Sequence, residues 1–124
     1  MTRRLRIVVA DDEEDVREYF QRILPHLGHD VAGVACNGRE LLEICRQQRP
    51  DMIISDLRMP EMDGDEALRA FCSERPTPCI LVTAFSKSVE EPAESGGLKW
   101  MFLTKPIKRR DLETAIASVS DEES

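Results

Sequence analysis

The sequence lacks any long hydrophobic run. It contains 124 residues, of which 41% are hydrophobic and 33% charged, and no apolar stretch approaches the roughly 20 residues that a membrane-spanning helix needs. The apolar run at residues 7–10 follows basic residues but is too short for a signal peptide, and Asp11 and Asp12 end it. We therefore expect one cytoplasmic domain, residues 1–124, with no membrane span.

An excess of basic residues is also absent. The formal net charge of −7 argues against direct nucleic-acid binding, because duplex binding relies on clustered positive charge. Two small basic clusters lie at residues 3–6 and 108–110. We interpret both clusters as solvated surface.

The cysteine spacings of a metal or redox site are missing as well. No CxxC pair and no Cys/His ligand pattern occurs among the four cysteines, Cys36, Cys45, Cys72 and Cys79. Free, mostly buried thiols are therefore expected. The two histidines, His26 and His29, are interpreted as surface residues rather than ligands.

What the sequence does contain is a regular alternation of short apolar runs and amphipathic segments. The runs predict five strands, at residues 5–10, 31–36, 52–56, 79–82 and 100–103. Apolar residues at helical spacing predict a helix after each of the first three strands. The first of these helices ends near Gly28, the second runs to Pro50, and the third extends from Asp63-Gly64 to Pro76. The same spacing also follows the fifth strand, at Leu112, Ala115, Ile116 and Val119. Such alternation predicts βαβ units, and hence an α/β fold whose parallel sheet has helices on both faces.

Two connecting segments are less regular. Asn37-Gly38 is predicted to be a turn before the second helix. Residues 86–95 should form a helix between the fourth and fifth strands, but only Val89 and Ala93 offer apolar contacts, and Pro92 interrupts the segment. We expect that helix to be short, frayed or partly non-helical.

Polar residues stand at the carboxyl ends of four predicted strands, namely Asp11 and Asp12, Asp56, Thr83, and Lys105. In a parallel sheet these ends lie at one edge, where ligands bind. Three carboxylates at close range repel one another unless a cation joins them, and oxygen ligands suit Mg²⁺. A metal, an ammonium and a hydroxyl around one aspartate also describe how a transferring phosphoryl group is held. The pattern therefore predicts Asp56 as a nucleophile beside a magnesium site.

These motifs together resemble the receiver domain of two-component response regulators, over residues 5 to about 119. The matching elements, in order, are Asp11-Asp12, Ser55-Asp56, Met59-Pro60, Met62-Asp63-Gly64, Thr83-Ala84 and Lys105-Pro106. The resemblance implies a flavodoxin-like fold with strand order 2-1-3-4-5. It also implies that a histidine kinase or phosphotransfer protein phosphorylates Asp56, and that the signal passes to a downstream output domain or effector.

The same resemblance assigns roles to further residues. Mg²⁺ would be held by Asp56, Asp11, Asp12 and the carbonyl of Arg58. Thr83 and Lys105 would contact the phosphoryl oxygens, Phe102 would be an aromatic switch, and the Lys105-Pro106 bond would be cis. Simpler interpretations exist for single residues, since Asp12 could cap a helix, Thr83 could be an ordinary strand-end hydroxyl, and Phe102 could be a core residue.

Two other classes of protein were weighed. A hydrolase of the aspartate-nucleophile phosphatase class shares the Asp, Thr, Lys and Mg²⁺, but a second aspartate two residues after the nucleophile would favour it, and Arg58 stands there. A degenerate receiver that acts only as an interaction module would ignore Mg²⁺. The sequence leaves open the cognate kinase, the output process and the oligomeric state, a homodimer included.

The lifetime of the phosphoryl group should depend on Arg58 and Phe85, which stand two residues after Asp56 and Thr83. Both are expected to line the mouth of the site and to limit the access of water. In the alternative, Arg58 turns outward to pair with Glu13 or Glu61 and Phe85 packs on the frayed helical segment at residues 86–95, which leaves the mouth open.

Overall fold

The computed structural model describes residues 4–84 and 100–120. Five parallel strands form one sheet in the order β2-β1-β3-β4-β5, so the predicted topology is confirmed. The strands are β1 (Arg6–Ala10), β2 (Asp30–Ala35), β3 (Met52–Asp56), β4 (Cys79–Thr83) and β5 (Trp100–Thr104).

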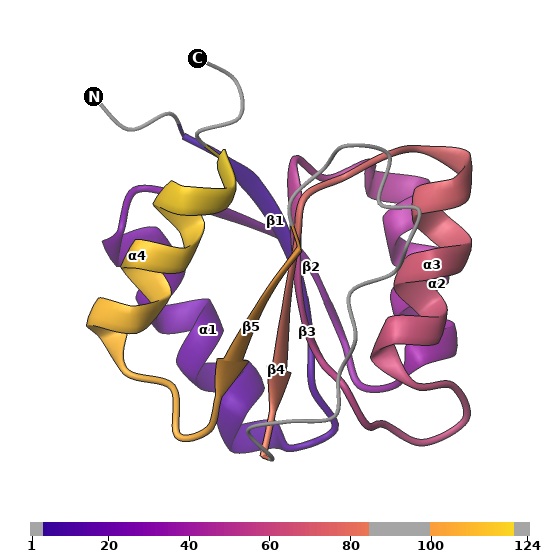
Figure 1. Ribbon diagram of the computed structural model, residues 1–124, viewed down its shortest axis with the longest axis horizontal. Helices are drawn as coiled ribbons and strands as arrows, with labels where there is room; N and C mark the ends of the chain where they lie inside the picture. Colours follow the sequence, from indigo (N-terminus) through magenta and orange to yellow (C-terminus); the bar gives the residue numbers. More distant parts are fainter. Residues whose placement is uncertain (1–3, 85–99, 121–124) are drawn as a thin grey trace.

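Helices cover both faces of the sheet, as Figure 1 shows. Helices α1 (Glu14–His26) and α4 (Arg109–Ser120) lie on one face, and α2 (Gly38–Gln48) and α3 (Gly64–Glu74) lie on the other. The label α4 denotes the last helix of the chain. The helix predicted at residues 86–95 lies outside the residues that the structure describes.

The central strand, β3, is buried along its whole length. Its side chains alternate between two cores: Ile53 belongs to the cluster under α2 and α3, whereas Met52 and Ile54 belong to the cluster under α1 and α4. A strand covered on both faces needs an unbroken apolar run rather than an alternating one. The run before Asp56 supplies it, and so the only acid of β3 falls at its carboxyl end.

The start of α2 corrects one prediction. Asn37-Gly38 is not a separate turn, because Asn37 is the N-cap of α2 and Gly38 is its first residue. The Asn37 side chain accepts a hydrogen bond from the Glu40 N–H at 2.7 Å, and Glu40 Oε1 accepts one from the Cys36 N–H at 2.7 Å. The two bonds satisfy N–H groups at the helix start much as a capping box does, except that Glu40 bonds the N–H of Cys36, the residue before the N-cap, instead of that of Asn37.

The prediction that both histidines lie at the surface is half wrong. His26 is exposed, but His29 is only 3% exposed. His29 Nδ1 accepts a hydrogen bond from the Leu5 N–H at 3.1 Å, which ties the α1–β2 turn to the start of β1. Burial, followed by the nearby Arg4 charge, lowers the pKa of His29. The ring is a structural acceptor of a backbone hydrogen bond, a role that its position in the sequence does not reveal.

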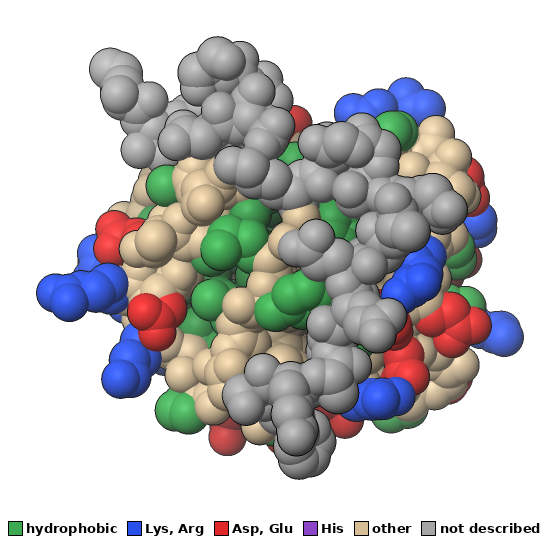
Figure 2. All heavy atoms as spheres, in the orientation of Figure 1, with side chains coloured by type: hydrophobic (Ala, Val, Ile, Leu, Met, Phe, Trp, Pro, Cys, Tyr) green, Lys and Arg blue, Asp and Glu red, His purple; other side chains and the backbone are tan. Residues whose placement is uncertain are grey.

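The surface has the mixed charge expected of solvated faces. On the face shown in Figure 2, basic and acidic side chains are interspersed over the outer helices rather than gathered in one basic patch. Arg4 pairs with Asp30 across the sheet edge, and residues 108–110 are exposed. Within residues 4–84 and 100–120, no helix is both long and apolar enough to cross a membrane.

Candidate functional site

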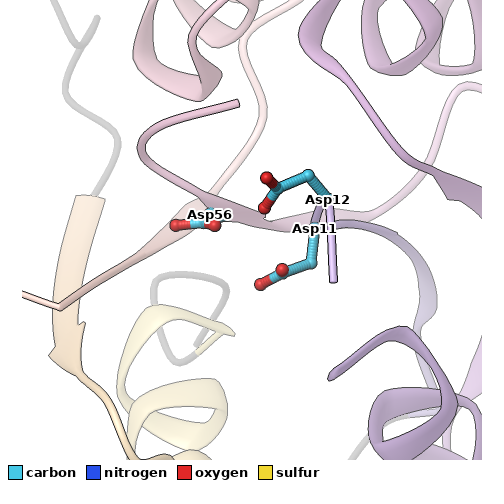
Figure 3. Close-up of side chains that lie close together, drawn as sticks. All are labelled: Asp11, Asp12 and Asp56. Carbon is cyan, nitrogen blue, oxygen red and sulfur yellow. The ribbon is translucent and has the colours of Figure 1, made fainter. Parts of the chain in front are cut away.

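Three carboxylates meet at the carboxyl edge of the sheet, as Figure 3 shows. Asp11 directly follows β1 and Asp56 ends β3, and these strands are neighbours in which Ala10 pairs with Ser55. Asp11, Asp12 and Asp56 each offer an oxygen, and these oxygens lie within 4.8 Å of one another. The structure thus brings together the acids that the sequence predicted.

Asp11 is held by its backbone and by one of its two carboxylate oxygens. Its N–H donates to the Ala35 carbonyl at 3.1 Å, and its carbonyl accepts a hydrogen bond from the Arg17 guanidinium at 2.8 Å. Oδ1 accepts one from the Glu13 N–H at 2.9 Å. Oδ2 is buried and has no hydrogen-bond partner in the part of the chain that the structure describes. One carboxylate oxygen is thereby fixed, and the other is left directed at the cluster.

Lys105 lies between the two buried acids. Its Nζ is 3.3 Å from Asp11 Oδ2 and 3.3 Å from Asp56 Oδ2, and only the contact with Asp56 has the alignment of a hydrogen bond. The Lys105 N–H donates to the carbonyl of Thr83 at 2.9 Å, which links the ends of β4 and β5. Thr83 is 5% exposed. The Lys105-Pro106 bond is cis, as the resemblance implied.

Burial and crowding make the charges of this cluster costly. Burial, reinforced by the Asp11 charge, raises the pKa of Asp56 to about 6 although Lys105 opposes the shift. Burial also raises the pKa of Asp11. For Lys105, burial lowers the pKa but the two carboxylates raise it by more. One ammonium thus does not offset two buried carboxylates, and the cluster favours an additional cation.

Replacing Asp56 by Asn should stabilise the metal-free protein at neutral pH. Because the pKa of Asp56 is about 6 in the fold and 3.8 ordinarily, stability is lost as pH rises from about 4 through about 6, by at most about 3 kcal/mol. Neutral Asn avoids this loss. Urea unfolding in EDTA should show the variant to be the more stable at about pH 8, with the advantage gone at about pH 4. Equal stability at both pH values would contradict the crowding argument.

These residues fit a magnesium ion. Oxygen ligands at close range suit a hard divalent cation, and the Oδ2 of Asp11, which forms an ion pair with Lys105 but accepts no hydrogen bond, is directed at the cluster. Asp12 is exposed, which suits a metal that keeps part of its water shell. The contribution of the Arg58 carbonyl stays a prediction.

The loop after Asp56 depends on a close approach that the sequence did not reveal. A Cβ at Gly64, the first residue of α3, would lie 2.0 Å from the Asp56 carbonyl oxygen and 2.6 Å from Ser55 Oγ. The Gly64 N–H donates to the Leu57 carbonyl at 2.8 Å. Only a residue without a side chain lets α3 begin so near Asp56. The sequence marked Gly64 as a helix start, but not as this contact.

Three further residues were predicted to belong to the site, and the structure describes two of them, Arg58 and Phe102. The Arg58 guanidinium is exposed and pairs with Asp63 at 3.1 Å, so it turns outward, but to neither Glu13 nor Glu61. Phe102 is partly buried and packs against the core under α2 and α3. Phe85 lies outside the described residues, and the prediction about the mouth of the site is untested.

An apolar pocket of about 400 Å³ adjoins Lys105. It lies between the start of α1 and the loop after β5, and it is lined by Glu13, Asp15, Val16, Tyr19, Lys105, Pro106 and Ile107. Sequence analysis missed it. The available signal was the spacing of Val16 and Tyr19, three residues apart on α1, which puts both on one helix face.

Comparisons with known proteins agree with this geometry. Residues 7–117 match the response regulator receiver domain family. Transcriptional regulatory protein PdtaR of Mycobacterium tuberculosis is 34% identical over 113 residues, which cover 90% of this chain and 54% of PdtaR. A protein-glutamate methylesterase/protein-glutamine glutaminase of Mesorhizobium japonicum is 45% identical over 85 residues, or 68% of this chain and 25% of that protein. The chain thus spans about half the length of PdtaR.

Solved receiver-domain structures also resemble this fold. The signal receiver domain of the putative response regulator NarL from Mycobacterium tuberculosis superposes with a TM-score of 0.79 at 31% identity, over 97% of this chain and 98% of that one. The family match covers most of the chain. The chain therefore belongs to the response regulator receiver domain family, the regulatory module of two-component systems.

Proposed function

We propose that this domain is a phosphoacceptor switch in which Asp56 receives a phosphoryl group from a phosphohistidine of a histidine kinase or phosphotransfer protein. The observation that carries the proposal is the placement of Asp56. Its side chain ends a buried strand, its oxygen lies among those of Asp11 and Asp12, and Lys105 Nζ lies 3.3 Å away. A lone carboxylate at the surface would have none of these neighbours.

The transfer is an in-line displacement at phosphorus. A carboxylate oxygen of Asp56 forms the new P–O bond while the P–N bond to the donor imidazole breaks, and that ring leaves with the bonding electron pair. Lys105 would neutralise charge on the phosphoryl oxygens, and the Thr83 hydroxyl would donate a hydrogen bond to one of them. Mg²⁺, when bound by Asp11, Asp12 and Asp56, supplies further neutralisation of that charge. The same residues would assist the later hydrolysis of the acyl phosphate.

A phosphatase-like hydrolase has less support. That class was expected to place a second aspartate two residues after the nucleophile, whereas Arg58 stands there and its guanidinium pairs with Asp63. The domain lacks this acid to protonate a leaving group. We propose that it regulates an output domain or effector, in the cytoplasm, rather than processing a substrate.

Phosphorylation should depend strictly on the metal. Wild-type protein mixed with acetyl phosphate and Mg²⁺ should gain the mass of one phosphoryl group, and EDTA should prevent the gain, because two buried carboxylates repel an incoming phosphoryl anion. Intact-protein mass spectrometry measures the outcome. Asp12→Ala should also block the gain while leaving the fold intact. Equal labelling with Mg²⁺ and with EDTA would refute the proposed chemistry.

The pocket beside Lys105 is our candidate for docking of the phosphodonor protein. It adjoins the residue that contacts Asp56, so a donor seated there could present its phosphohistidine to the cluster. Its lining is mostly apolar, with Val16, Tyr19 and Ile107, and it also includes the acids Glu13 and Asp15. We expect an apolar donor surface flanked by basic residues.

Tyr19→Ala should slow phosphotransfer from a phosphorylated histidine phosphotransfer protein but not from acetyl phosphate. Loss of one anchoring ring costs about 1.4 kcal/mol, or about tenfold. Tyr19→Phe keeps the ring and is the matched control, expected to react as wild type does. Single-turnover transfer kinetics with both donors give the comparison. A similar slowing with both donors would mean that the ring supports the fold rather than docking.

A further inference from the structure

Two cysteines lie in contact at the junction of α3 and β4. Cys72 is in the last turn of α3, Cys79 is the first residue of β4, and their Sγ atoms are 3.8 Å apart. Both thiols also lie within hydrogen-bonding range of the Thr77 carbonyl, at 3.5 Å from Cys72 and 3.2 Å from Cys79. The pair is therefore oriented by a shared acceptor, apart from the acidic cluster.

The connecting loop holds this arrangement in place. Thr77 is buried, and its hydroxyl donates to the Arg75 carbonyl at 2.9 Å. Prolines at positions 76 and 78 restrict the backbone on both sides of Thr77. The restricted loop thus keeps the two sulfurs in contact.

The two thiols differ in a way that suits stepwise oxidation. Cys72 is only half-buried, and a hydrogen bond from the Cys79 thiol lowers its pKa. Cys79 is fully buried, and burial raises its pKa. Cys45, on the neighbouring helix α2, is also buried, which raises its pKa to about 12. Cys72 is the more exposed of the two residues and the one whose pKa is lowered, so we assign it as the thiol that reacts first with a small oxidant and Cys79 as its resolving partner.

We propose that Cys72 and Cys79 form a reversible intramolecular disulfide when the domain meets a peroxide. The Cys72 thiolate attacks one peroxide oxygen, the O–O bond breaks, and water leaves after protonation, which gives a sulfenic acid. The Cys79 sulfur then attacks the Cys72 sulfur and displaces a second water. In sum, two thiols and one hydrogen peroxide give one disulfide and two waters. This modification is independent of the proposed phosphoryl transfer.

The bond would fix the end of α3 to the start of β4, the strand whose other end carries Thr83. Closure requires the sulfurs to move from 3.8 Å to about 2.0 Å. Oxidation would thus constrain α3, the helix that connects the loop after Asp56 to β4, without modifying Asp11, Asp12 or Asp56.

Peroxide treatment followed by alkylation in denaturant tests the proposal. In wild type the number of alkylatable thiols should fall from the four cysteines of the chain to two, dithiothreitol should restore all four, and peptide mapping should find residues 72 and 79 linked. The yield should not depend on protein concentration. Cys36→Ser, which removes the exposed thiol, is the matched control and should still lose two thiols.

Cys72→Ala should form no internal disulfide, and its circular dichroism spectrum should match that of wild type. Cys79→Ala gives an independent check, because its remaining Cys72 should stop at the sulfenic acid, which dimedone traps. The proposal is wrong if wild type yields only dimers linked through Cys36. It is equally wrong if Cys72 is over-oxidised while Cys79 stays alkylatable.

Discussion

Asp56→Asn protein should take up no phosphoryl group from acetyl phosphate in the presence of Mg²⁺. Asparagine keeps the shape of the side chain but offers no anionic oxygen to attack phosphorus. The neighbouring acids do not replace it: Asp11 already uses one oxygen to accept from Glu13, and its other oxygen lies beside Lys105. We therefore expect the intact-protein mass of the variant to remain unchanged while wild type gains one phosphoryl group.

Asp51→Asn is the matched control for this experiment. Asp51 precedes the same strand at its opposite end, where its carboxylate accepts from the Arg6 N–H at 2.9 Å, and an amide oxygen can still accept that bond. The control should label as wild type does. If Asp56→Asn is labelled at the wild-type level, another residue is the phosphoryl acceptor and the proposed mechanism is wrong.

Gly64→Ala should damage both the fold and the site. The added methyl carbon would lie 2.0 Å from the Asp56 carbonyl oxygen, a backbone atom that cannot move aside as the end of a flexible side chain can. We expect a loss of about 3 kcal/mol in unfolding free energy, at the upper end of overpacking costs. Displacement of Asp56 should also reduce labelling by acetyl phosphate in the fraction that remains folded. Urea unfolding and mass spectrometry measure the two effects.

Gly28→Ala separates this steric effect from a general cost of replacing glycine. Gly28 has a φ of 93°, but nothing lies within 4 Å of an added Cβ. Its replacement should cost about 1 kcal/mol through backbone strain alone and should leave labelling unchanged. Equal losses in the two variants would show that the contact between Gly64 and Asp56 carries no special weight.

The fold was predictable because its signals are local. The apolar run of β3 ends at Asp56, and the spacing of Leu112 and Ile116 sets the buried face of α4, which the structure confirms. Helix α2 begins earlier than predicted because Asn37 acts as a cap instead of a turn residue. Asparagine serves in both settings, but Glu40 three residues later is a helix-start signal that favours the cap.

The sequence predicted which residues form the candidate site, but not the packing contacts that hold the surrounding structure in place. Residues at strand ends meet because parallel strands share an edge, and this rule placed Asp11, Asp56 and Lys105 together. The burial of His29 against Leu5 and the space reserved at Gly64 depend on tertiary packing. Such contacts join segments that are remote in sequence and leave no periodic signal.

Chemical mapping of the acyl phosphate tests the central claim most directly. Wild-type protein labelled with acetyl phosphate and Mg²⁺ is reduced with borohydride, which converts a phosphorylated aspartate to homoserine, and is then digested and sequenced by mass spectrometry. The account predicts homoserine at position 56 alone. Homoserine at position 11, 12 or 63, or no homoserine in a protein that carries the phosphoryl mass, would contradict it.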